Sequence, residues 1–475
     1  MNYLKDVIIA FLPEIILALF GCFALLISLL SKKRREKTPK ALCFGGIATA
    51  LTSVSLSQTG TLGFFSNSVV TSEFTTFLKT LILIGAFLCV LIFGNFLQKQ
   101  KGNPFRVVSV FLFLILASAC LISANNFGIL FVCTLIISLL TAKFIAFASE
   151  DKNAQRKYYA VSGVSLLFIL GGITYIFWFY RVFNFEQISQ YLVQFYPTVG
   201  FSIALIFIAA GLLFNVLAAP FCLVFPDIFE KTNHVFPVVC TTILPVAGFA
   251  AIIKLLSVFG TYSLITNIAL MLLASLTLVT GITGMIRRHK MTGFLGYSAV
   301  AHSGFMLIGI CSLYLTNMAA ILFYLLCYIF MNIGVWSAVC IYNESNNPDE
   351  VEGYKGLFFK RPFYVGAFSV CLFALAGMPV TSGFLSKLYL FMAMARSGLV
   401  YLLFLIFTML SAVVAAYAYL RVIRLFYESS EHLNKLHNRL PLLKYVLYFS
   451  TVVTILLCIF ARPLINLCKI VTYST

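Results

Sequence analysis

The stretch Ser369–Phe391, SVCLFALAGMPVTSGFLSKLYLF, decides the fold of this chain. It is apolar at both ends, is interrupted by Gly377, Pro379 and Gly383, and carries one lysine, Lys387, after the interruption. Helix breakers inside a membrane span leave backbone groups unpaired, so they are tolerated only where protein or a water-filled cavity surrounds them. A lysine at that depth costs roughly 2.5–3.5 kcal/mol on insertion scales. The stretch therefore predicts a broken membrane helix with a functional ionisable side chain.

The composition of the whole chain supports the same class. The 475 residues are 61% hydrophobic and only 10% charged, and their mean hydropathy is +1.01. A soluble globular chain is about 25% charged. The net charge of +18 could indicate nucleic-acid binding, but most basic residues lie in short loops between apolar stretches, as the positive-inside rule describes. We expect one integral membrane domain over residues 1–475, with the lipid bilayer and not nucleic acid as its surroundings.

Motifs for metal, nucleotide or redox centres do not occur in the sequence. The 13 cysteines form no C-x-x-C pair and lie mostly in apolar stretches, where cysteine behaves as a small hydrophobe. No glycine-rich nucleotide motif or P-loop is present. The longest cytoplasmic loops, 344–361 and 427–441, are too short to form a catalytic domain. We therefore expect no metal or cofactor bound by this chain, and any redox chemistry must belong to partner subunits.

An all-α polytopic fold is expected, since a membrane-spanning helix needs about 20 apolar residues. Fourteen candidate spans are present: 8–30, 41–58, 75–98, 106–123, 127–148, 159–180, 199–223, 235–259, 264–286, 294–313, 317–342, 363–393, 398–426 and 442–461. Of 33 lysines and arginines, 24 fall in the loops from odd to even spans and 5 in the opposite loops. This bias places both termini outside the cell and the basic loops in the cytoplasm.

A second span is also interrupted. The stretch Phe214–Lys231, FNVLAAPFCLVFPDIFEK, is broken by Pro220 and ended by Pro226–Asp227. Two interrupted spans, the seventh and the twelfth, indicate an internal inverted repeat with halves 106–259 and 264–426 and a transport path near the breaks. The alternative is two kinked helices without a transport role, since proline is common in membrane helices.

Short motifs along most of the chain keep the order of a known family. They are Leu12–Glu14, Ala154 with Lys157–Tyr158, Pro220–Phe221 with Pro226–Asp227, Ala247–Phe249, Tyr297–Ser298, Ala301–Phe305, Gly356–Leu357, Leu375–Pro379 and Gly383–Lys387. With them the chain resembles the antiporter-like membrane subunits of respiratory complex I, the proton-translocating NADH:quinone oxidoreductase. Subunit N is the most similar of these, because the long lateral helix of the L-type subunit is missing. The last two motifs are the most specific.

The resemblance implies a half-channel mechanism in the cell (inner) membrane. In that family, lysines on broken helices and a glutamate on the fifth span move protons along a hydrated axis. Other subunits carry NADH, FMN, iron–sulfur clusters and quinone, and the expected partners are the other membrane-arm subunits. Three of the family's charged positions are neutral here: Leu135 replaces the glutamate, and Asn215 and Pro245 replace lysines.

Three ionisable residues remain as a candidate proton pathway. Lys387 follows the break, where water could reach it, although it could instead snorkel to the membrane surface. His302 has an ordinary pKa near 6.5 that suits a relay, or it could be a neutral histidine bonded within its helix bundle. Lys254 lies only about 1.5 turns before Gly260, so it could also snorkel.

Three further residues are accessory candidates. Glu14 is the one carboxylate clearly inside a span apart from the border residue Glu73, and it could pair with a neighbouring subunit or face an interface. Asp227 could cap the end of the broken seventh span. Tyr297 could extend a hydrogen-bonded chain toward His302, or simply pack against its neighbours.

The hypothesis is that the first half is silent and that conduction uses the second half. Two other functions remain open. One is a subunit of a related ion-pumping assembly, such as a membrane-bound hydrogenase or a multi-subunit cation/proton antiporter. The other is a structural subunit that has lost transport, which the neutral residues Leu135, Asn215 and Pro245 favour.

Overall fold

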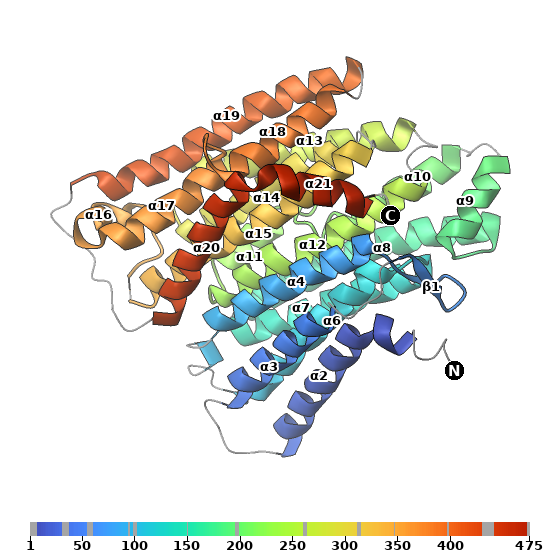
Figure 1. Ribbon diagram of the computed structural model, residues 1–475, viewed down its shortest axis with the longest axis horizontal. Helices are drawn as coiled ribbons and strands as arrows, with labels where there is room; N and C mark the ends of the chain where they lie inside the picture. The colour runs from blue at the N-terminus through green and yellow to red at the C-terminus, as the bar shows by residue number, and fades with distance from the viewer. Residues whose placement is uncertain are drawn as a thin grey trace. The chain divides into compact units, whose positions relative to one another are not determined.

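The computed structural model describes residues 7–30, 38–54, 60–93, 96–97, 102–149, 151–194, 199–259, 264–310, 315–345, 347–396, 399–429 and 441–472. These residues are almost entirely helical, which confirms the all-α class (Figure 1). The helices are α2 (Leu12–Leu30), α3 (Thr38–Val54), α4 (Glu73–Ile92), α6 (Pro104–Ser123), α7 (Phe127–Ala148), α8 (Lys152–Tyr180), α9 (Phe185–Gln194), α10 (Val199–Leu212), α11 (Val224–Phe229), α12 (Val235–Phe259), α13 (Leu264–Arg287), α14 (Met291–Ile310), α15 (Leu315–Asn343), η2 (Glu352–Tyr354), α16 (Leu357–Lys360), α17 (Pro362–Ala376), α18 (Ser382–Ala395), α19 (Leu399–Tyr427), α20 (Pro441–Ile459) and α21 (Ala461–Thr472).

Within the described ranges, eleven helices are long and apolar enough to cross a membrane. Three shorter apolar helices, α10, α17 and α18, accompany them. The polytopic membrane class is therefore confirmed. The antiparallel hairpin of β1 (Leu62–Phe64) and β2 (Val69–Thr71), and the short helices α9 and α21, were not predicted from the apolar pattern.

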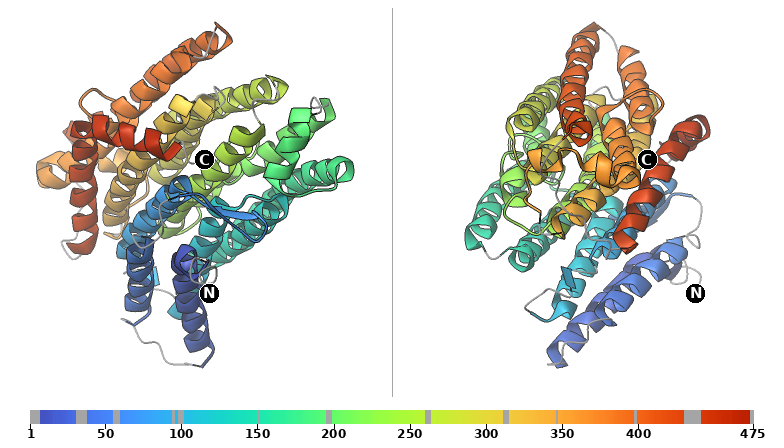
Figure 2. Two further views of the ribbon diagram at one scale, coloured as in Figure 1. Left: turned by 45° about the vertical axis from the view of Figure 1, so that its right-hand side comes forward. Right: turned by 90° about the vertical axis from the view of Figure 1, so that its left-hand side faces the viewer.

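The chain forms two compact units. Unit 1 comprises Met1–Val216, Ile243–Ala269 and Val471–Thr475, and unit 2 comprises Leu217–Thr242 and Leu270–Ile470. In unit 1, α2 packs against α3 and α6, and α8 packs against α10; both views of Figure 2 show the blue helices α2 and α3 side by side. In unit 2, α15 is central and packs against α14, α17, α18 and α20.

The interruption between α17 and α18 has a defined local structure. Gly377 ends α17 in the left-handed region, at φ 80°, which a glycine adopts without strain. The side-chain oxygen of Thr381 accepts a hydrogen bond from Phe384 N, which caps α18. Gly383 permits the close packing of the two half-helices, because a Cβ there would lie 1.7 Å from the carbonyl oxygen of Ala374. The twelfth apolar stretch is thus two helices joined by a short turn.

The interruption after α10 is longer and ends in the short helix α11. Residues 213–223 form turns, and the Ala219–Pro220 peptide bond is cis. Within unit 2, the hydroxyl oxygen of Thr277 on α13 accepts a hydrogen bond from Ala219 N at 2.9 Å. One turn further along α13, the Thr280 hydroxyl lies 3.5 Å from the Cys222 thiol. An uncharged hydroxyl therefore supports the backbone of this interruption, and a second contacts one of its side chains.

Candidate functional site

Lys387 lies at the centre of the candidate site in unit 2. Its Nζ donates hydrogen bonds to the carbonyl oxygens of Leu375 at 3.1 Å and Ala376 at 2.9 Å, and the residue is only 4% exposed. These carbonyls end α17, where the helix break leaves them without helical partners and the helix dipole is negative. Lys387 therefore does not snorkel to a surface of the described structure, because its charge is held by the broken end of a helix.

His302 on α14 is the centre of a buried hydrogen-bond network. Its Nδ1 lies 2.8 Å from the Tyr324 hydroxyl of α15, and its Nε2 lies 3.1 Å from the Tyr419 hydroxyl of α19. The Tyr419 hydroxyl also bonds Ser298, one turn before His302. Each of these groups can both donate and accept a proton, with the histidine doing so through its two ring nitrogens. The four side chains can therefore pass a proton along a continuous chain.

An aromatic ring lies near both this network and Lys387. The Lys387 Nζ is 4.9 Å from the centre of the Phe305 ring, and that ring centre lies 6.3 Å from the His302 ring centre. A lysine ammonium is attracted to the face of an aromatic ring at such distances. The positive charge of Lys387 also acts on His302 electrostatically. Lys387 and His302 are therefore coupled by charge, and the Phe305 ring lies near both.

A charged cluster surrounds the turn between α13 and α14. Arg288 donates hydrogen bonds to Asp227 at 2.6 Å and Glu230 at 2.9 Å, and also contacts the Tyr297 hydroxyl at 3.4 Å. Burial opposes the Arg288 charge, but the bonds to Tyr297 and Asp227 and the charge of Glu230 outweigh it and raise its pKa. The N-cap of α11 is Leu223, so the expectation that Asp227 caps this segment is wrong. Asp227 and Tyr297 instead share the guanidinium of Arg288.

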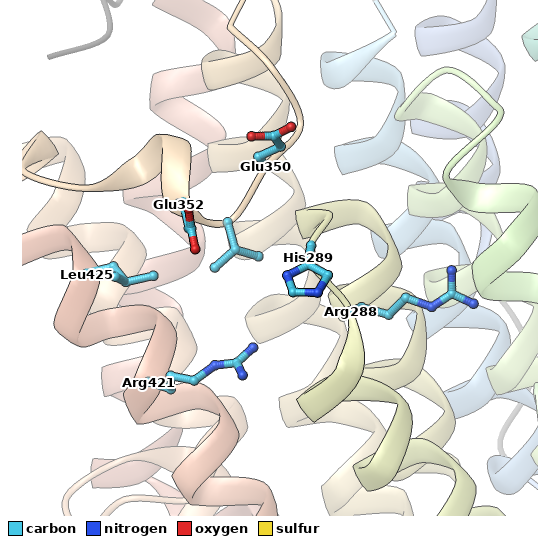
Figure 3. A pocket seen from close by; sticks show the side chains of 7 residues that line it. Arg288, His289, Glu350, Glu352, Arg421 and Leu425 are labelled. Carbon is cyan, nitrogen blue, oxygen red and sulfur yellow. The ribbon is translucent and has the colours of Figure 1, made fainter. Parts of the chain in front are cut away.

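A polar pocket of about 440 Å³ opens beside this turn. Figure 3 shows the His289 and Arg421 side chains at the pocket, with Glu350 and Glu352 on the opposite wall, whereas Arg288 points away. Arg421 also donates to the carbonyl oxygen of Ile286 at 3.0 Å. Arg288, which also lines the pocket, contacts the hydroxyl of Tyr297, the residue before Ser298 on α14.

The remaining sequence candidates lie in unit 1. Lys254 is 8% exposed, and its Nζ donates to the carbonyl oxygen of Ala124 at 3.2 Å. Glu14 forms a buried ion pair with Lys79 of α4, with Nζ and Oε1 2.5 Å apart. Of the alternatives for Glu14, pairing with a neighbouring subunit is not required for its charge, because Lys79 of the same chain is its partner.

The neutral replacements leave the first half without a charged break. Asn215 is buried in the turns after α10, and Pro245 lies inside α12. In unit 2, near the start of α12, the Asn332 amide donates to the hydroxyl oxygens of Thr241 and Thr242 at 2.8 and 3.2 Å. Polar groups occur there, but they do not titrate near neutral pH.

Sequence reasoning missed four contributing residues: Tyr324, Tyr419, Arg288 and Lys79. The two tyrosines are far from His302 in sequence, and a tyrosine in an apolar helix is usually a packing residue. Lys79 is visible as a lysine within a span, but its partner Glu14 could be identified only from the packing of α2 and α4. Where the structure is described, no group of three or more His, Cys, Asp or Glu could hold a metal ion.

Comparison with known proteins gives consistent matches over most of the chain. Residues 124–415 match the family model described as NADH:quinone oxidoreductase/Mrp antiporter, TM. The NADH-quinone oxidoreductase subunit N of Trichlorobacter lovleyi is 30% identical over 423 residues, which cover 87% of this chain and 86% of the relative. The subunit N of Rhodospirillum rubrum is 29% identical over 440 residues, 90% of this chain and 89% of the relative.

Solved structures show a shared fold at lower identity. A chain of respiratory complex I from Thermus thermophilus aligns with a TM-score of 0.81 at 22% identity and covers 96% of this chain and 98% of that one. A chain of an archaeal membrane-bound sulfane sulfur reductase aligns with a TM-score of 0.85 at 18% identity, covering 97% and 96% of the two chains. The fold alone therefore does not separate these assemblies, whereas the sequence relatives point to subunit N.

Proposed function

Because the chain belongs to the NADH:quinone oxidoreductase/Mrp antiporter family, in its subunit N branch, we propose that it is a proton-translocating membrane subunit of an NADH-quinone oxidoreductase. The structural observation that carries the transport role is the Lys387 ammonium on the terminal carbonyls of α17. Carbonyl oxygens favour the ammonium form, while burial penalises its charge. This opposition makes the protonation state of Lys387 sensitive to any change in charge nearby.

The proposed route in unit 2 begins at the polar pocket. A proton passes from the pocket to the Ser298, Tyr419 and His302 chain, and the Tyr324 hydroxyl bonds the far nitrogen of the ring. When His302 is protonated, its positive charge repels the ammonium of Lys387 on α18, and Lys387 then releases its proton. The Phe305 ring lies near both groups and limits direct backflow. Glu350 and Glu352 at the pocket can collect protons from solvent.

The basic loops indicate on which side of the membrane this proton route begins. With the charge bias read by the positive-inside rule, the α13–α14 turn and its pocket face the cytoplasm, and both termini lie on the outer, periplasmic side. Counting α3 as a span beside the eleven long helices, and pairing α10 with α11 and α17 with α18, gives fourteen spans, arranged as inverted halves over 106–259 and 264–426. Each half then contains one broken helix near mid-membrane, as in many transporters.

The first break is proposed to be silent in proton transport. Asn215 cannot exchange a proton near neutral pH, and the backbone amide of Ala219 in the same interruption is satisfied by the Thr277 hydroxyl. A structural subunit without transport is the second candidate function, and these neutral residues are the observation that favours it. Partner subunits carry NADH, FMN, the iron–sulfur clusters and quinone, and electron transfer among them drives the protons.

One purification tests both which assembly the chain belongs to and whether the chain transports protons. The tagged chain is purified in mild detergent, its partners are identified by mass spectrometry, and NADH:quinone activity is assayed. An active multi-subunit oxidoreductase is expected, and recovery with hydrogenase or antiporter subunits would move the chain to that assembly. The same complex with Lys387→Ala, in vesicles, should pump fewer protons per NADH, and unchanged pumping would favour the structural role.

A further inference from the structure

We propose that Glu14, Lys79 and Lys254 form a second proton-exchange site, which lies within unit 1 and does not use the α10–α11 break. The inference rests on the function proposed above, because it adds a second site to the same translocation. It concerns residues on α2, α4 and α12: α2 and α4 pack against α6, and Lys254 of α12 bonds the C-cap residue of α6.

The buried ion pair between Glu14 and Lys79 has fewer hydrogen bonds around it than a purely structural ion pair needs. Both residues are about 5% exposed or less, and their charged atoms are 2.5 Å apart. Apart from that ammonium, neither carboxylate oxygen of Glu14 has a hydrogen-bond donor among the residues that the structure describes. A buried ion pair stabilises a fold only when further hydrogen bonds satisfy its remaining lone pairs. The carboxylate of Glu14 therefore retains the capacity to accept a proton.

Helix α6 connects this pair to Lys254. The Cys120 thiol of α6 is close enough to feel the charges of both Glu14 and Lys79. One turn later, the carbonyl oxygen of Ala124, at the end of α6, accepts the hydrogen bond from Lys254. The Ser123 hydroxyl between them is buried and has no partner in the described ranges. Polar atoms without protein partners at such a site are places where water bridges buried groups.

The charges of the three groups are coupled. Lys254 and Lys79 repel each other, while Glu14 attracts Lys79. When Lys254 gains a proton, the repulsion favours transfer of one proton from the Lys79 ammonium to the Glu14 carboxylate. That transfer produces a neutral amine and a neutral acid, and no other reactant is needed. Glu14 then releases its proton, and the proton held by Lys254 passes to the neutral Lys79 amine, so all three groups return to their starting states.

Lys79→Arg is the variant that separates exchange from structure. Arginine keeps the positive charge and the ion pair with Glu14, but it does not release its proton in proteins. In the intact oxidoreductase reconstituted into vesicles, we expect K79R to assemble and to pump fewer protons per NADH. Assembly with wild-type pumping and turnover would overturn the proposal. Lys143→Arg is the matched control, because Lys143 is an exposed lysine on α7 of the same unit and should change nothing.

A second variant decides the case if the larger arginine prevents assembly. The double change Glu14→Gln with Lys79→Met removes both charges, so neither is left buried and unpaired. Reduced pumping per NADH in the assembled double variant supports the site, and wild-type pumping overturns it. Lys387→Ala, tested in parallel, reports on the function itself: a loss there with normal K79R pumping rejects the second site alone.

Discussion

The two helix breaks of this chain solve one problem with opposite chemistry. At the α17–α18 break, the freed carbonyls of Leu375 and Ala376 bind the ammonium of Lys387. At the α10–α11 break, the freed Ala219 amide binds the neutral hydroxyl of Thr277. Both solutions satisfy buried backbone groups, but only the α17–α18 break places a titratable charge in the membrane. A broken helix is therefore evidence of a supported backbone, and the partner of its freed groups determines whether it can carry protons.

The largest expected effect comes from removing the charge at the second break. Lys387→Ala eliminates the ammonium and leaves the α17 carbonyls without their donor. We expect proton transfer through unit 2 to fall by on the order of 100-fold, the range typical of a lost acid–base group. The measurement is proton pumping by the reconstituted complex, normalised to assembled protein. Pumping at the wild-type rate would show that the two breaks do not differ in function.

The next effect concerns the close packing of α17 against α18 at the charged break. Gly383→Ala places a Cβ 1.7 Å from the carbonyl oxygen of Ala374, so the two half-helices must separate. Overpacking of this kind typically costs about 1–3 kcal/mol, and a contact with backbone falls at or above the upper end. Thermal unfolding of the purified complex measures the loss. Gly366→Ala in α17 is the control, since a Cβ there meets nothing within 4 Å.

A smaller effect is expected at the neutral break. Thr277→Val keeps the shape of the side chain but removes the acceptor for Ala219 N. A buried N–H without an acceptor costs about 1–3 kcal/mol. Stability of the complex should fall while pumping per assembled complex stays unchanged. The matched control, Thr283→Val on the exposed face of the same helix, should shift stability by less than about 0.5 kcal/mol. A loss of pumping in T277V would contradict the silent assignment.

For the last variant, Asn215→Lys, we expect no change in proton transport. Asn215→Lys places a lysine at the neutral break, but Leu135, which aligns with the glutamate of the family that the chain resembles, supplies no carboxylate to tune it. We expect the variant to pump no more protons per NADH than the wild type, whatever it costs in stability. Vesicle assays of the N215K complex beside the Lys387→Ala complex provide the test. A rise in pumping with N215K, together with no change in K387A, would reverse the assignment of the two halves.

The fold and the charged break were predictable because both depend on local patterns. Gly377, Pro379 and Lys387 stand within one apolar stretch, and their spacing alone indicates a broken helix that carries a buried amine. The partners of His302 were not predictable, since Tyr324 and Tyr419 come from distant helices and resemble ordinary packing residues. The same holds for Glu14, whose charge partner depends on how α2 and α4 pack.

The ring of His302, bonded to a hydroxyl at each nitrogen, also constrains the timing of transport. A proton that arrives at one nitrogen while another leaves from the opposite nitrogen converts the imidazole into its other tautomer. Every hydroxyl along the chain then points the reverse way, so a second proton cannot follow in the same direction. The hydroxyl groups must rotate, or the ring must turn over, before the next passage. In the proposed route, the network therefore admits one proton per reset, which makes reorientation, and not only charge, a step of each transport cycle.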